Sequence, residues 1–230
     1  MNNLAIIPAR GGSKRIPRKN VKKFSGKPMI AWSIELALRS QLFSRVIVST
    51  DDDEIADVAA SYGAEVPFRR PEHLSGDFVG TREVIDHAIE VSTSLDYKPD
   101  TACCMYPCAP FLSPDNLAAA IAKLDAAGIG SFLYPVIEFP APIERAMRMD
   151  TNGRIRPVDP SAMLTRTQDL APAYYDAGQF YWGHVETWLS GKPISDDALT
   201  IVLDASQVVD IDTPADWVKA ESIAAHSRRR

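Results

Sequence analysis

Short apolar segments alternate with longer amphipathic segments along most of this chain, and this order constrains its fold more than any other feature. The apolar segments have the length of buried strands, and the amphipathic segments have helical period with capping residues and prolines at their starts. Strands are expected at residues 4–9, 45–50, 65–68, 101–105, 131–136, 179–182, 199–203 and 208–212. Helices are expected at residues 28–39, from the acids at 51–53 to residue 61, at residues 81–91 and 114–124, and from residue 214 onward.

This alternation predicts an α/β fold in which a mostly parallel sheet lies between two layers of helices, a three-layer α/β/α, Rossmann-like nucleotide-binding architecture. In such sheets the ligand site lies at the carboxyl ends of the strands. The chain contains no linker, internal repeat or low-complexity stretch, so residues 1–230 are expected to form a single domain. Periodicity is lost between residues 137 and 175, and a connection this long is typical of a lid or an interface arm.

Composition excludes several classes of protein. No apolar run approaches the roughly 20 residues that cross a bilayer, and the start of the chain has no signal-peptide core, so a cytoplasmic protein without membrane contact is expected. Two of the three cysteines, Cys103 and Cys104, are adjacent in an apolar segment. Reduced core thiols are therefore expected rather than a disulfide framework.

Charge is distributed unevenly. Residues 1–34 hold eight basic and no acidic side chains, although the whole chain has a net charge of −5. A local positive field in an acidic protein favours a compact polyanion such as a nucleoside triphosphate over a nucleic acid, and the alternative is a solvated basic loop. The terminal Arg228, Arg229 and Arg230 are expected to be a frayed tail.

The basic segment includes a glycine-rich loop directly after the first expected strand. Gly11 and Gly12 allow backbone N–H groups to turn toward an anion, and Ser13 can add its hydroxyl group. Arg10, Lys14 and Lys19 can neutralise phosphate oxygens. The loop matches neither GxxxxGK[ST] nor GxGxxG, so it predicts phosphate binding outside the P-loop and dinucleotide classes.

A second signal is the pair Asp210 and Asp212, at the end of the last expected strand. Residues at i and i+2 of a strand share a face, so both carboxylates can reach one Mg²⁺, which prefers a few carboxylates with phosphate oxygens and water. The alternative is that Asp212 only supports the start of the following helix. The acidic cluster Asp51, Asp52 and Asp53 is interpreted mainly as helix capping and surface charge.

At these residues the chain resembles the cytidylyltransferases that activate nine-carbon 2-keto sugar acids as CMP-sugars, the family of the CMP-sialic acid synthetases. The resemblance rests on residues 7–20 (IPARGGSKRIPRKN), 70–74 (RPEHL) and 210–214 (DIDTP), and it covers nearly the whole chain. It implies a fold of the nucleotide-diphospho-sugar transferase type. Within this family the chain is similar to the pseudaminic acid cytidylyltransferases, because Tyr106 replaces a family glutamine and residues 176–183 read DAGQFYWG.

The resemblance also implies roles for individual residues. Residues implied to bind the nucleotide are Ala9, Arg10, Gly11, Gly12, Ser13, Lys14, Lys19, Asn20, Arg70, Thr81 and Tyr106. Residues implied to bind the sugar are Tyr106, Arg145, Arg166, Gln179, Phe180 and Tyr181, with a guanidinium group on the sugar carboxylate and an aromatic wall against a sugar rich in deoxy and acetamido groups. Trp182 is a further candidate for this wall, although strand alternation predicts that about half of residues 179–182 face the core. Arg10, Lys14, Lys19, Asp210 and Asp212 are implied to be catalytic, with Asp210 and Asp212 holding Mg²⁺.

The implied reaction is attack of the anomeric hydroxyl group of pseudaminic acid on the α-phosphorus of CTP, which gives CMP-pseudaminic acid and diphosphate. Residues 137–175 are implied to form a dimerisation arm that reaches the site of a neighbouring copy. Three alternatives stay open at this point: an N-acylneuraminate or legionaminate cytidylyltransferase, a nucleotide-binding module without catalysis, and a nucleic-acid binder with a basic arm. The acidic remainder of the chain argues against the last of these.

Overall fold

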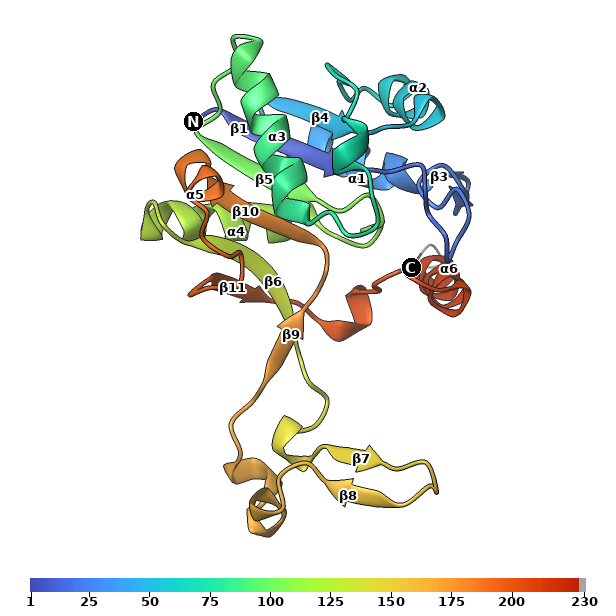
Figure 1. Ribbon diagram of the computed structural model, residues 1–230, viewed down its shortest axis with the longest axis vertical. Coiled ribbons are helices and arrows are strands. Elements are labelled where there is room, and N and C mark those ends of the chain that lie inside the picture. Colours follow the sequence, from blue (N-terminus) through green and yellow to red (C-terminus); the bar gives the residue numbers. More distant parts are fainter. Residues whose placement is uncertain (228–230) are drawn as a thin grey trace.

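A seven-stranded sheet forms the centre of the computed structural model, which describes residues 1–227 (Figure 1). Its strand order is β11-β6-β10-β5-β1-β4, and β9 pairs with β6 off this path. The sheet strands are β1 (Asn3–Pro8), β4 (Arg45–Ser49), β5 (Thr101–Met105), β6 (Phe132–Glu138), β9 (Tyr174–Asp176), β10 (Phe180–His184) and β11 (Leu199–Val202). Two small hairpins are formed by β2 (Lys23–Phe24) with β3 (Lys27–Pro28) and by β7 (Met147–Met149) with β8 (Ile155–Pro157).

The helices are α1 (Met29–Ser40), α2 (Asp53–Ser61), α3 (Thr81–Ser94), α4 (Pro114–Ala127), α5 (Val185–Leu189) and α6 (Pro214–Ser227). Short 3-10 helices lie at Glu72–Leu74, Ile143–Arg145, Ser161–Leu164, Thr167–Asp169 and Ala205–Gln207. The sequence predicts the N-caps of two long helices correctly, since the side chains of Asp52 and Ser113 accept the N–H groups of Ile55 and Asn116. None of the helices in residues 1–227 is long and apolar enough to cross a membrane. The C-terminal arginines, expected to fray, lie outside the described residues.

The sheet is mostly parallel, as the alternation predicts. Strand β1 pairs in parallel with β4 and β5, and β11 pairs in parallel with β6. Strand β10 differs, because it is antiparallel to both of its neighbours, β5 and β6. The chain leaves the sheet at the end of β6, passes through the arm and returns along β9 and β10, so these strands must run back in the opposite direction.

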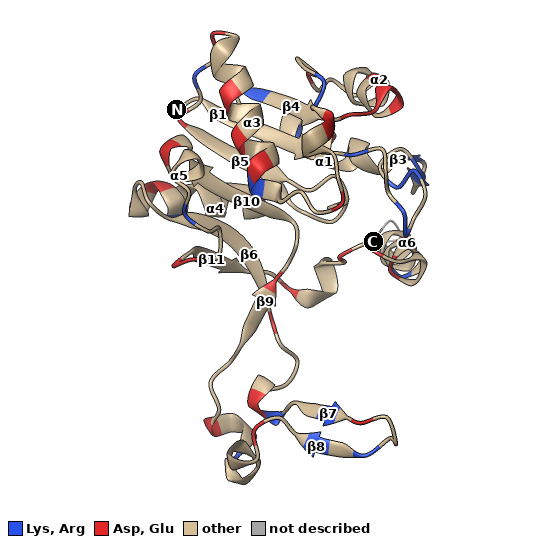
Figure 2. Cartoon of the chain, viewed as in Figure 1, with Lys and Arg blue, Asp and Glu red and all other residues tan. Residues whose placement is uncertain are grey.

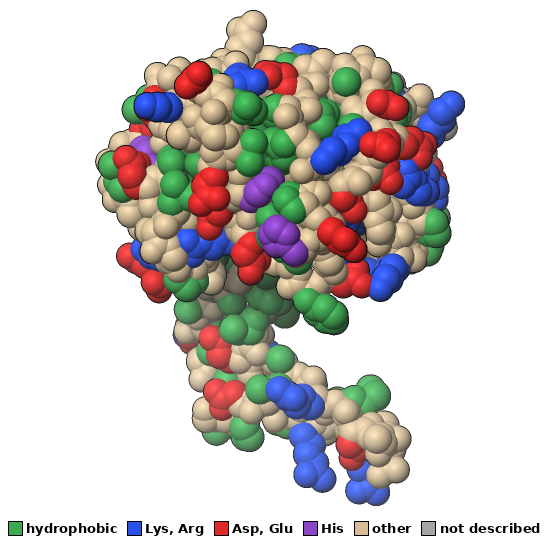
Figure 3. Space-filling view, turned by 45° about the horizontal axis from the view of Figure 1, so that its top comes forward, with side chains coloured by type: hydrophobic (Ala, Val, Ile, Leu, Met, Phe, Trp, Pro, Cys, Tyr) green, Lys and Arg blue, Asp and Glu red, His purple; other side chains and the backbone are tan. Residues whose placement is uncertain are grey.

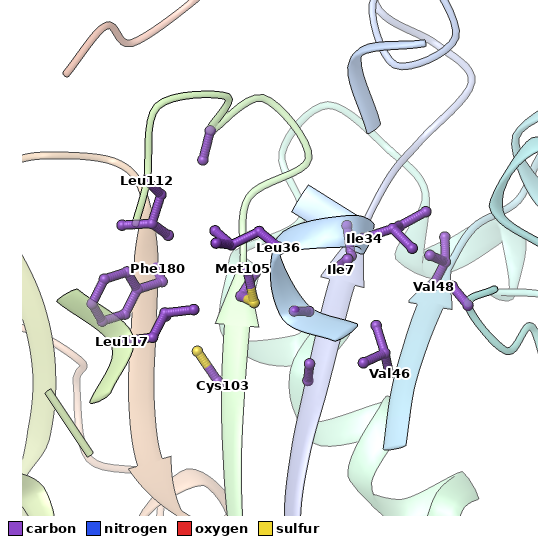
Figure 4. Packing of buried hydrophobic residues seen from close by; sticks show 14 of the residues in the cluster. Ile7, Ile34, Leu36, Val46, Val48, Cys103, Met105, Leu112, Leu117 and Phe180 are labelled. Carbon is purple, nitrogen blue, oxygen red and sulfur yellow. The ribbon is translucent and has the colours of Figure 1, made fainter. Parts of the chain in front are cut away.

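Strand alternation divides the core between the two faces of the sheet. On one face, α1, α2 and α4 cover a cluster that includes Ile7, Val48 and Cys103 (Figure 4). On the other face, α3 and α5 cover Ile6 and Cys104, the neighbours of those residues in the chain. The three-layer α/β/α architecture is therefore confirmed, and all three cysteines are free, as expected.

Two predicted strands are wrong. Residues 65–68 make a single bridge, between Ile47 and Glu65, because Pro67 has no N–H group to continue the ladder. Residues 208–212 are extended but pair with no strand of the described chain. Their alternate side chains are nevertheless buried, with Val209 and Ile211 in one apolar cluster and Val208 in another.

The cluster around α6 joins the two ends of the chain. It contains Ile16 from the glycine-rich loop, Ile211 from between the two aspartates, and Trp217 of α6. The ring of Phe24 meets Trp217 edge-on with centroids 5.5 Å apart. Apolar packing thus brings residues 10–20 beside residues 210–212.

Residues 139–173 form an arm that projects from the sheet on the two strands β6 and β9 (Figure 1). It contains the hairpin β7-β8 and three of the short 3-10 helices, so it is not the irregular segment that the lost periodicity suggests. Several of its apolar side chains are exposed, with Leu164 at 93% and Met149 at 72%. Figure 3 shows hydrophobic side chains where the arm leaves the body, and Lys and Arg side chains toward its tip.

Candidate active site

A cavity of about 570 Å³ opens at the carboxyl ends of β1 and β5. This is the edge of the sheet at which α/β folds bind ligands, and the volume is in the range of small-molecule sites. Its lining residues come from five separate parts of the sequence. The sequence-predicted residues that line it are Arg10, Ser13, Lys14, Lys19, Asn20, Arg70, Thr81, Tyr106, Asp210 and Asp212.

The glycine-rich loop is held by the start of α2. The backbone N–H of Gly11 donates to Asp51 Oδ1 at 3.1 Å, and Arg18 donates to both carboxylate oxygens of Asp52 at 2.5 and 2.9 Å. A Cβ on residue 11 would lie 2.5 Å from Asp52 Oδ2, so the close approach of α2 requires glycine there. The acidic cluster at residues 51–53 therefore caps α2, as predicted, and also fixes the loop (Figure 2).

The cations of the loop face a carboxylate across the cavity. Arg10 Nη1 donates to Asp77 Oδ1 at 2.6 Å, and Lys14 Nζ donates to Asp77 Oδ2. These two bonds lower the pKa of Asp77, with the contact to Lys14 as the larger cause. An anionic group thus already lies between two cations that the sequence assigns to phosphate, so this part of the cavity is suited to an anion.

Arg70 and Asn20 are buried polar residues at the wall of the cavity. Within residues 1–227 the guanidinium group of Arg70 makes only long hydrogen bonds, 3.4 Å to Ser75 Oγ and 3.5 Å to Asp51 Oδ1, and burial lowers its pKa. Asn20 Nδ2 donates to the carbonyl oxygen of Arg10 at 3.1 Å. A buried guanidinium with weak partners favours a further acceptor, such as an oxygen atom of a bound nucleotide.

Asp210 and Asp212 line the same cavity as Asp77. Asp212 pairs with Arg15 at 2.8 Å and with Lys19 at 3.4 Å, whereas Asp210 makes no hydrogen bond or ion pair within residues 1–227. Partial burial, with the neighbouring charge of Asp212, raises the pKa of Asp210. The two carboxylates repel each other when both are charged. A divalent cation bound between them would remove this repulsion.

Asp210 and Asp212 suit a metal ion that is bound partly by the protein and partly by the phosphate groups of a bound nucleotide. In the described part of the chain no group of three or more His, Cys, Asp or Glu side chains is arranged to hold a metal. Two carboxylates leave the other positions of an octahedral cation to phosphate oxygens and water. The carboxylates share a side because buried Ile211 separates them in an extended segment, although this segment is not a strand.

Tyr106 forms the wall of the cavity next to Thr81. The hydroxyl groups of these two side chains are 3.1 Å apart. Tyr181 lies behind Tyr106, with ring centroids 5.5 Å apart, and its hydroxyl group donates to Asp176 Oδ2 at 2.6 Å. The sequence-based assignment of Tyr181 to the wall itself needs correction, since its side chain does not line the cavity.

Other residues assigned to the sugar wall face the core. Phe180 and Trp182 are fully buried on the face of the sheet that α1, α2 and α4 cover. Successive side chains of β10 point to opposite faces, so Tyr181 points to the face that α3 and α5 cover. Gln179 is also buried, and its side-chain amide donates to the carbonyl oxygens of Ala177 and Gly178. None of these three side chains lines the cavity, which corrects the predicted wall.

The two arginines assigned to the sugar carboxylate lie in the arm, away from the cavity of their own chain (Figure 1). Arg145 donates to the carbonyl oxygen of Thr165, and Arg166 pairs with Asp169 at 2.7 Å. Arg145 therefore joins two segments of the arm, whereas Arg166 pairs with the 3-10 helix that directly follows it. Within one chain they cannot meet a ligand of the cavity.

Three residues that were predicted to bind the nucleotide, Ala9, Gly11 and Gly12, do not line the cavity. Ala9 is fully buried in the core, where its N–H donates to the carbonyl oxygen of Ser49 at 2.9 Å. The N–H of Gly11 is already bonded to Asp51, and Gly12 is exposed in the same loop. These residues shape the loop that carries Arg10 and Ser13.

Sequence reasoning does not identify several lining residues, and Asp77 is the one with the strongest contacts. It precedes α3 by a few residues, in the loop that follows the RPEHL motif. The signal that could have identified Asp77 is the unpaired charge of residues 1–34, whose eight bases need acidic partners from elsewhere in the chain. The other unassigned lining residues are Pro8, Arg15, Leu74, Gly76, Val79, Gly80, Val84, Pro107, Cys108 and Gly178.

The chain is similar in sequence to proteins that form CMP-sugars. The family model described as "Cytidylyltransferase" matches residues 4–185. A pseudaminic acid cytidylyltransferase of Campylobacter jejuni is 44% identical over 94% of this chain and 93% of its own length. A CMP-N,N'-diacetyllegionaminic acid synthase of Legionella pneumophila is 34% identical over 97% of this chain and 96% of its own length.

Among solved structures, a CMP:2-keto-3-deoxy-manno-octonic acid synthetase complexed with CTP superposes with a TM-score of 0.74. The superposition covers 99% of this chain and all of the other, at 18% identity. At this level of identity the likeness shows a shared fold. The mostly parallel sheet with its flanking helices is thus an architecture that this synthetase shares.

Proposed function

The chain belongs to the cytidylyltransferase family, and from that premise we propose that it transfers the CMP group of CTP to pseudaminic acid and releases diphosphate. The relative from Campylobacter jejuni supports this substrate, since it bears that name and aligns over nearly both full lengths. We also propose that residues 1–230 act as a single cytidylyltransferase domain with residues 137–175 as its arm. The cytoplasmic location expected from the sequence stays a prediction.

One observation carries the proposal: a single cavity joins the basic glycine-rich loop to the aspartate pair. Arg10, Lys14, Asp210 and Asp212 all line it. A triphosphate needs cations along its oxygens, and a metal bridging phosphate and protein needs carboxylates nearby. A cavity that holds both groups of residues suits a triphosphate bound together with a metal.

In the proposed reaction the anomeric hydroxyl group of the sugar acid releases its proton to solvent, and its oxygen forms a bond to the α-phosphorus of CTP. The bond from this phosphorus to the oxygen that bridges the α- and β-phosphates breaks, and diphosphate leaves. Arg10 and Lys14 would exchange Asp77 for the β- and γ-phosphates and neutralise the charge that develops on diphosphate. Lys19 holds the aspartate segment in place, because its ammonium group donates to the carbonyl oxygen of Ile211 at 2.7 Å. Arg70 would orient the nucleotide.

We propose Mg²⁺ as the cofactor, held by Asp210 and Asp212. When bound, the ion polarises phosphoryl oxygens and offsets their charge. The residues themselves position it, since Arg15 and Lys19 fix Asp212 and leave Asp210 free.

The test is diphosphate release from CTP with Mg²⁺, run in parallel with pseudaminic, N-acetylneuraminic and legionaminic acids, with the CMP-sugar identified by mass. We expect pseudaminic acid to give the highest kcat/KM. If another sugar acid is preferred, the proposed nucleotide site stands and the proposed sugar substrate is wrong. Release with none of the three, alongside tight CTP binding, would leave only the binding module.

The 34% identity to a legionaminic acid synthase makes that sugar the second candidate. Tyr106 is the proposed discriminator, because it stands where the family has glutamine and forms the cavity wall. We expect Tyr106→Gln to lower the preference for pseudaminic over N-acetylneuraminic acid about tenfold, while the Kd for CTP stays within about twofold. Unchanged discrimination between the two sugars would remove Tyr106 from this role.

We further propose that two copies of the chain associate through the arm. In a single chain the arm packs mainly on itself, and it leaves Leu164, Met149 and Ile155 exposed. An exposed apolar surface of this kind is typical of an interface. A second copy would cover it, and the arm's Arg145 and Arg166 would then lie near the neighbour.

A further inference from the structure

We infer that Asp176 is a positioning residue for the sugar acid: through the hydroxyl group of Tyr181 it fixes the ring of Tyr106 at the wall of the cavity. The inference rests on the proposed function, because it concerns how that wall is held for the second substrate. Asp176 ends β9, Tyr181 lies in β10 and Tyr106 follows β5, so three strands contribute one residue each.

The main chain of Tyr106 is fixed independently of this group. Its N–H donates to the carbonyl oxygen of Gln179 at 2.9 Å, and its carbonyl oxygen accepts from the hydroxyl group of Ser33 at 2.8 Å. What remains variable is the direction of the ring. The ring meets the hydroxyl group of Thr81 at its tip and the ring of Tyr181 along its side.

Tyr181 is the fixed surface behind that ring. Only 8% of Tyr181 is exposed, and its ring lies between Tyr106 and Tyr134, at centroid distances of 5.5 and 5.6 Å. Its hydroxyl group is bonded to Asp176 Oδ2 at 2.6 Å. A buried hydroxyl needs a partner, so the carboxylate determines where this ring stands.

Asp176 uses its second oxygen to form the adjoining turn. Oδ1 accepts the N–H of Gly178 at 2.8 Å, and Gly178 has a φ of +60°, which favours glycine. A Cβ on residue 178 would lie 3.8 Å from Asp210 Cγ. One carboxylate thus ties the tyrosine wall to the backbone beside the proposed metal ligand.

This arrangement separates two effects. The side chains of Arg10, Asn20 and Arg70, which are proposed to face the nucleotide, form their hydrogen bonds with Asp77, with the carbonyl oxygen of Arg10, and with Ser75 and Asp51, and not with Asp176 or Tyr181. Loss of the Asp176–Tyr181 bond should therefore disturb the sugar side of the cavity and leave the CTP side intact. Asp176 does not line the cavity, so it acts through Tyr181 and Tyr106 rather than on the substrate.

Tyr181→Phe tests the inference with the smallest change, because it keeps the ring and the turn. We expect the KM for the sugar acid to rise about tenfold, with kcat and the Kd for CTP within about twofold. Tyr134→Phe is the matched control. It removes the hydroxyl group of the next ring in the cluster, which makes no hydrogen bond within residues 1–227, and its KM should equal that of the unmutated protein.

Asp176→Ala completes the test. Its rise in KM should be at least that of Tyr181→Phe, and the double variant should be no worse than Asp176→Ala alone, since both act through one bond. Asp176→Asn, which can still bond the Tyr181 hydroxyl, should restore most of the loss. Equal KM values for Tyr181→Phe and Tyr134→Phe, or additive effects in the double variant, would overturn the inference.

Failure of the proposed function has a different signature. If the unmutated protein prefers another sugar acid, the same KM comparison is made with that acid. If it turns over none, crystal structures of the unmutated and Tyr181→Phe proteins decide, because the inference requires the Tyr106 hydroxyl to leave Thr81 Oγ1 in the variant. An unmoved Tyr106 would overturn it without any substrate.

Discussion

The chemistry of this protein depends on a few charged side chains whose partners lie far away in the sequence. Asp212 is paired with Arg15 and Lys19, nearly 200 residues before it, and Asp77 is paired with Arg10 and Lys14. These pairs are partly exposed, so each contributes little to the free energy of unfolding. Their value lies in how they arrange charge around the cavity.

Asp212→Asn separates these two contributions. We expect kcat to fall at least about 100-fold, because a proposed metal ligand is lost, while Tm falls by no more than about 4 °C. Diphosphate release and thermal unfolding measure the two. Asp125→Asn, an exposed aspartate of α4, is the control and should change neither. A near-normal kcat for Asp212→Asn would remove it from the metal site.

Asp77→Asn should strengthen the binding of CTP. The carboxylate competes with the triphosphate for Arg10 and Lys14, so its removal should tighten CTP binding about three- to tenfold in calorimetry at low salt. Asp53→Asn makes the same charge change at an exposed pair with Arg69 and should have little effect. Weaker binding by Asp77→Asn would mean that this carboxylate orients the two cations instead of competing for them.

At the scale of elements, the start of α2 acts as the support of the glycine-rich loop. Asp52 caps the helix through Ile55 and binds Arg18, whose φ of 55° is unusual for a residue other than glycine. The hydrogen bond from Arg18 is the main cause of the lowered pKa of Asp52. One carboxylate therefore joins helix and loop.

Asp52→Asn keeps the cap and removes the charge. We expect a loss of less than about 1 kcal/mol in the free energy of unfolding at pH 7, since Arg18 is partly exposed, and a higher KM for CTP. Because the folded pKa of Asp52 is lowered, its stabilisation is present above the ordinary value of 3.8 and is lost as pH falls through the folded pKa. Urea unfolding of both proteins from pH 7 to pH 3 should show the difference shrinking. A difference that is constant with pH would contradict the ion pair.

At the scale of the whole molecule, the sheet presents the cavity while the arm carries an uncovered apolar surface. The antiparallel return of β9 and β10 from the arm also places Tyr181 against Tyr106 of the cavity wall, and Asp176 against Tyr181. The arm and the sugar side of the site are thus consecutive in the chain.

Leu164→Asp tests the proposed association. Leu164 is 93% exposed in one chain, so the change should leave Tm unaltered and yet shift the protein from dimer to monomer in sedimentation equilibrium. Val218→Asp, an exposed apolar residue of α6 outside the arm, should leave the dimer intact. A monomeric unmutated protein at micromolar concentration would end the proposal.

The sequence by itself determined six of the seven strands of the central sheet and five of its flanking helices, the burial of Cys103 and Cys104, and most of the charged lining of the cavity. Arg10, Lys14, Lys19 and the aspartate pair were identifiable because their signals are local: loop glycines, a run of bases, and alternation around Ile211. Helix starts such as Asp52 were identifiable because capping involves residues only a few positions apart.

Tertiary structure alone decided which face each β10 residue occupies, the direction of that strand and the partner of each loop cation. Phe180 and Tyr181 have similar sequence signals, and only the register with β5 places one in the core and the other behind Tyr106. Asp77 meets Arg10 across 67 residues, and such a pair depends on where two loops end in space. Local periodicity encodes elements, whereas contacts between distant segments arise only when those elements pack.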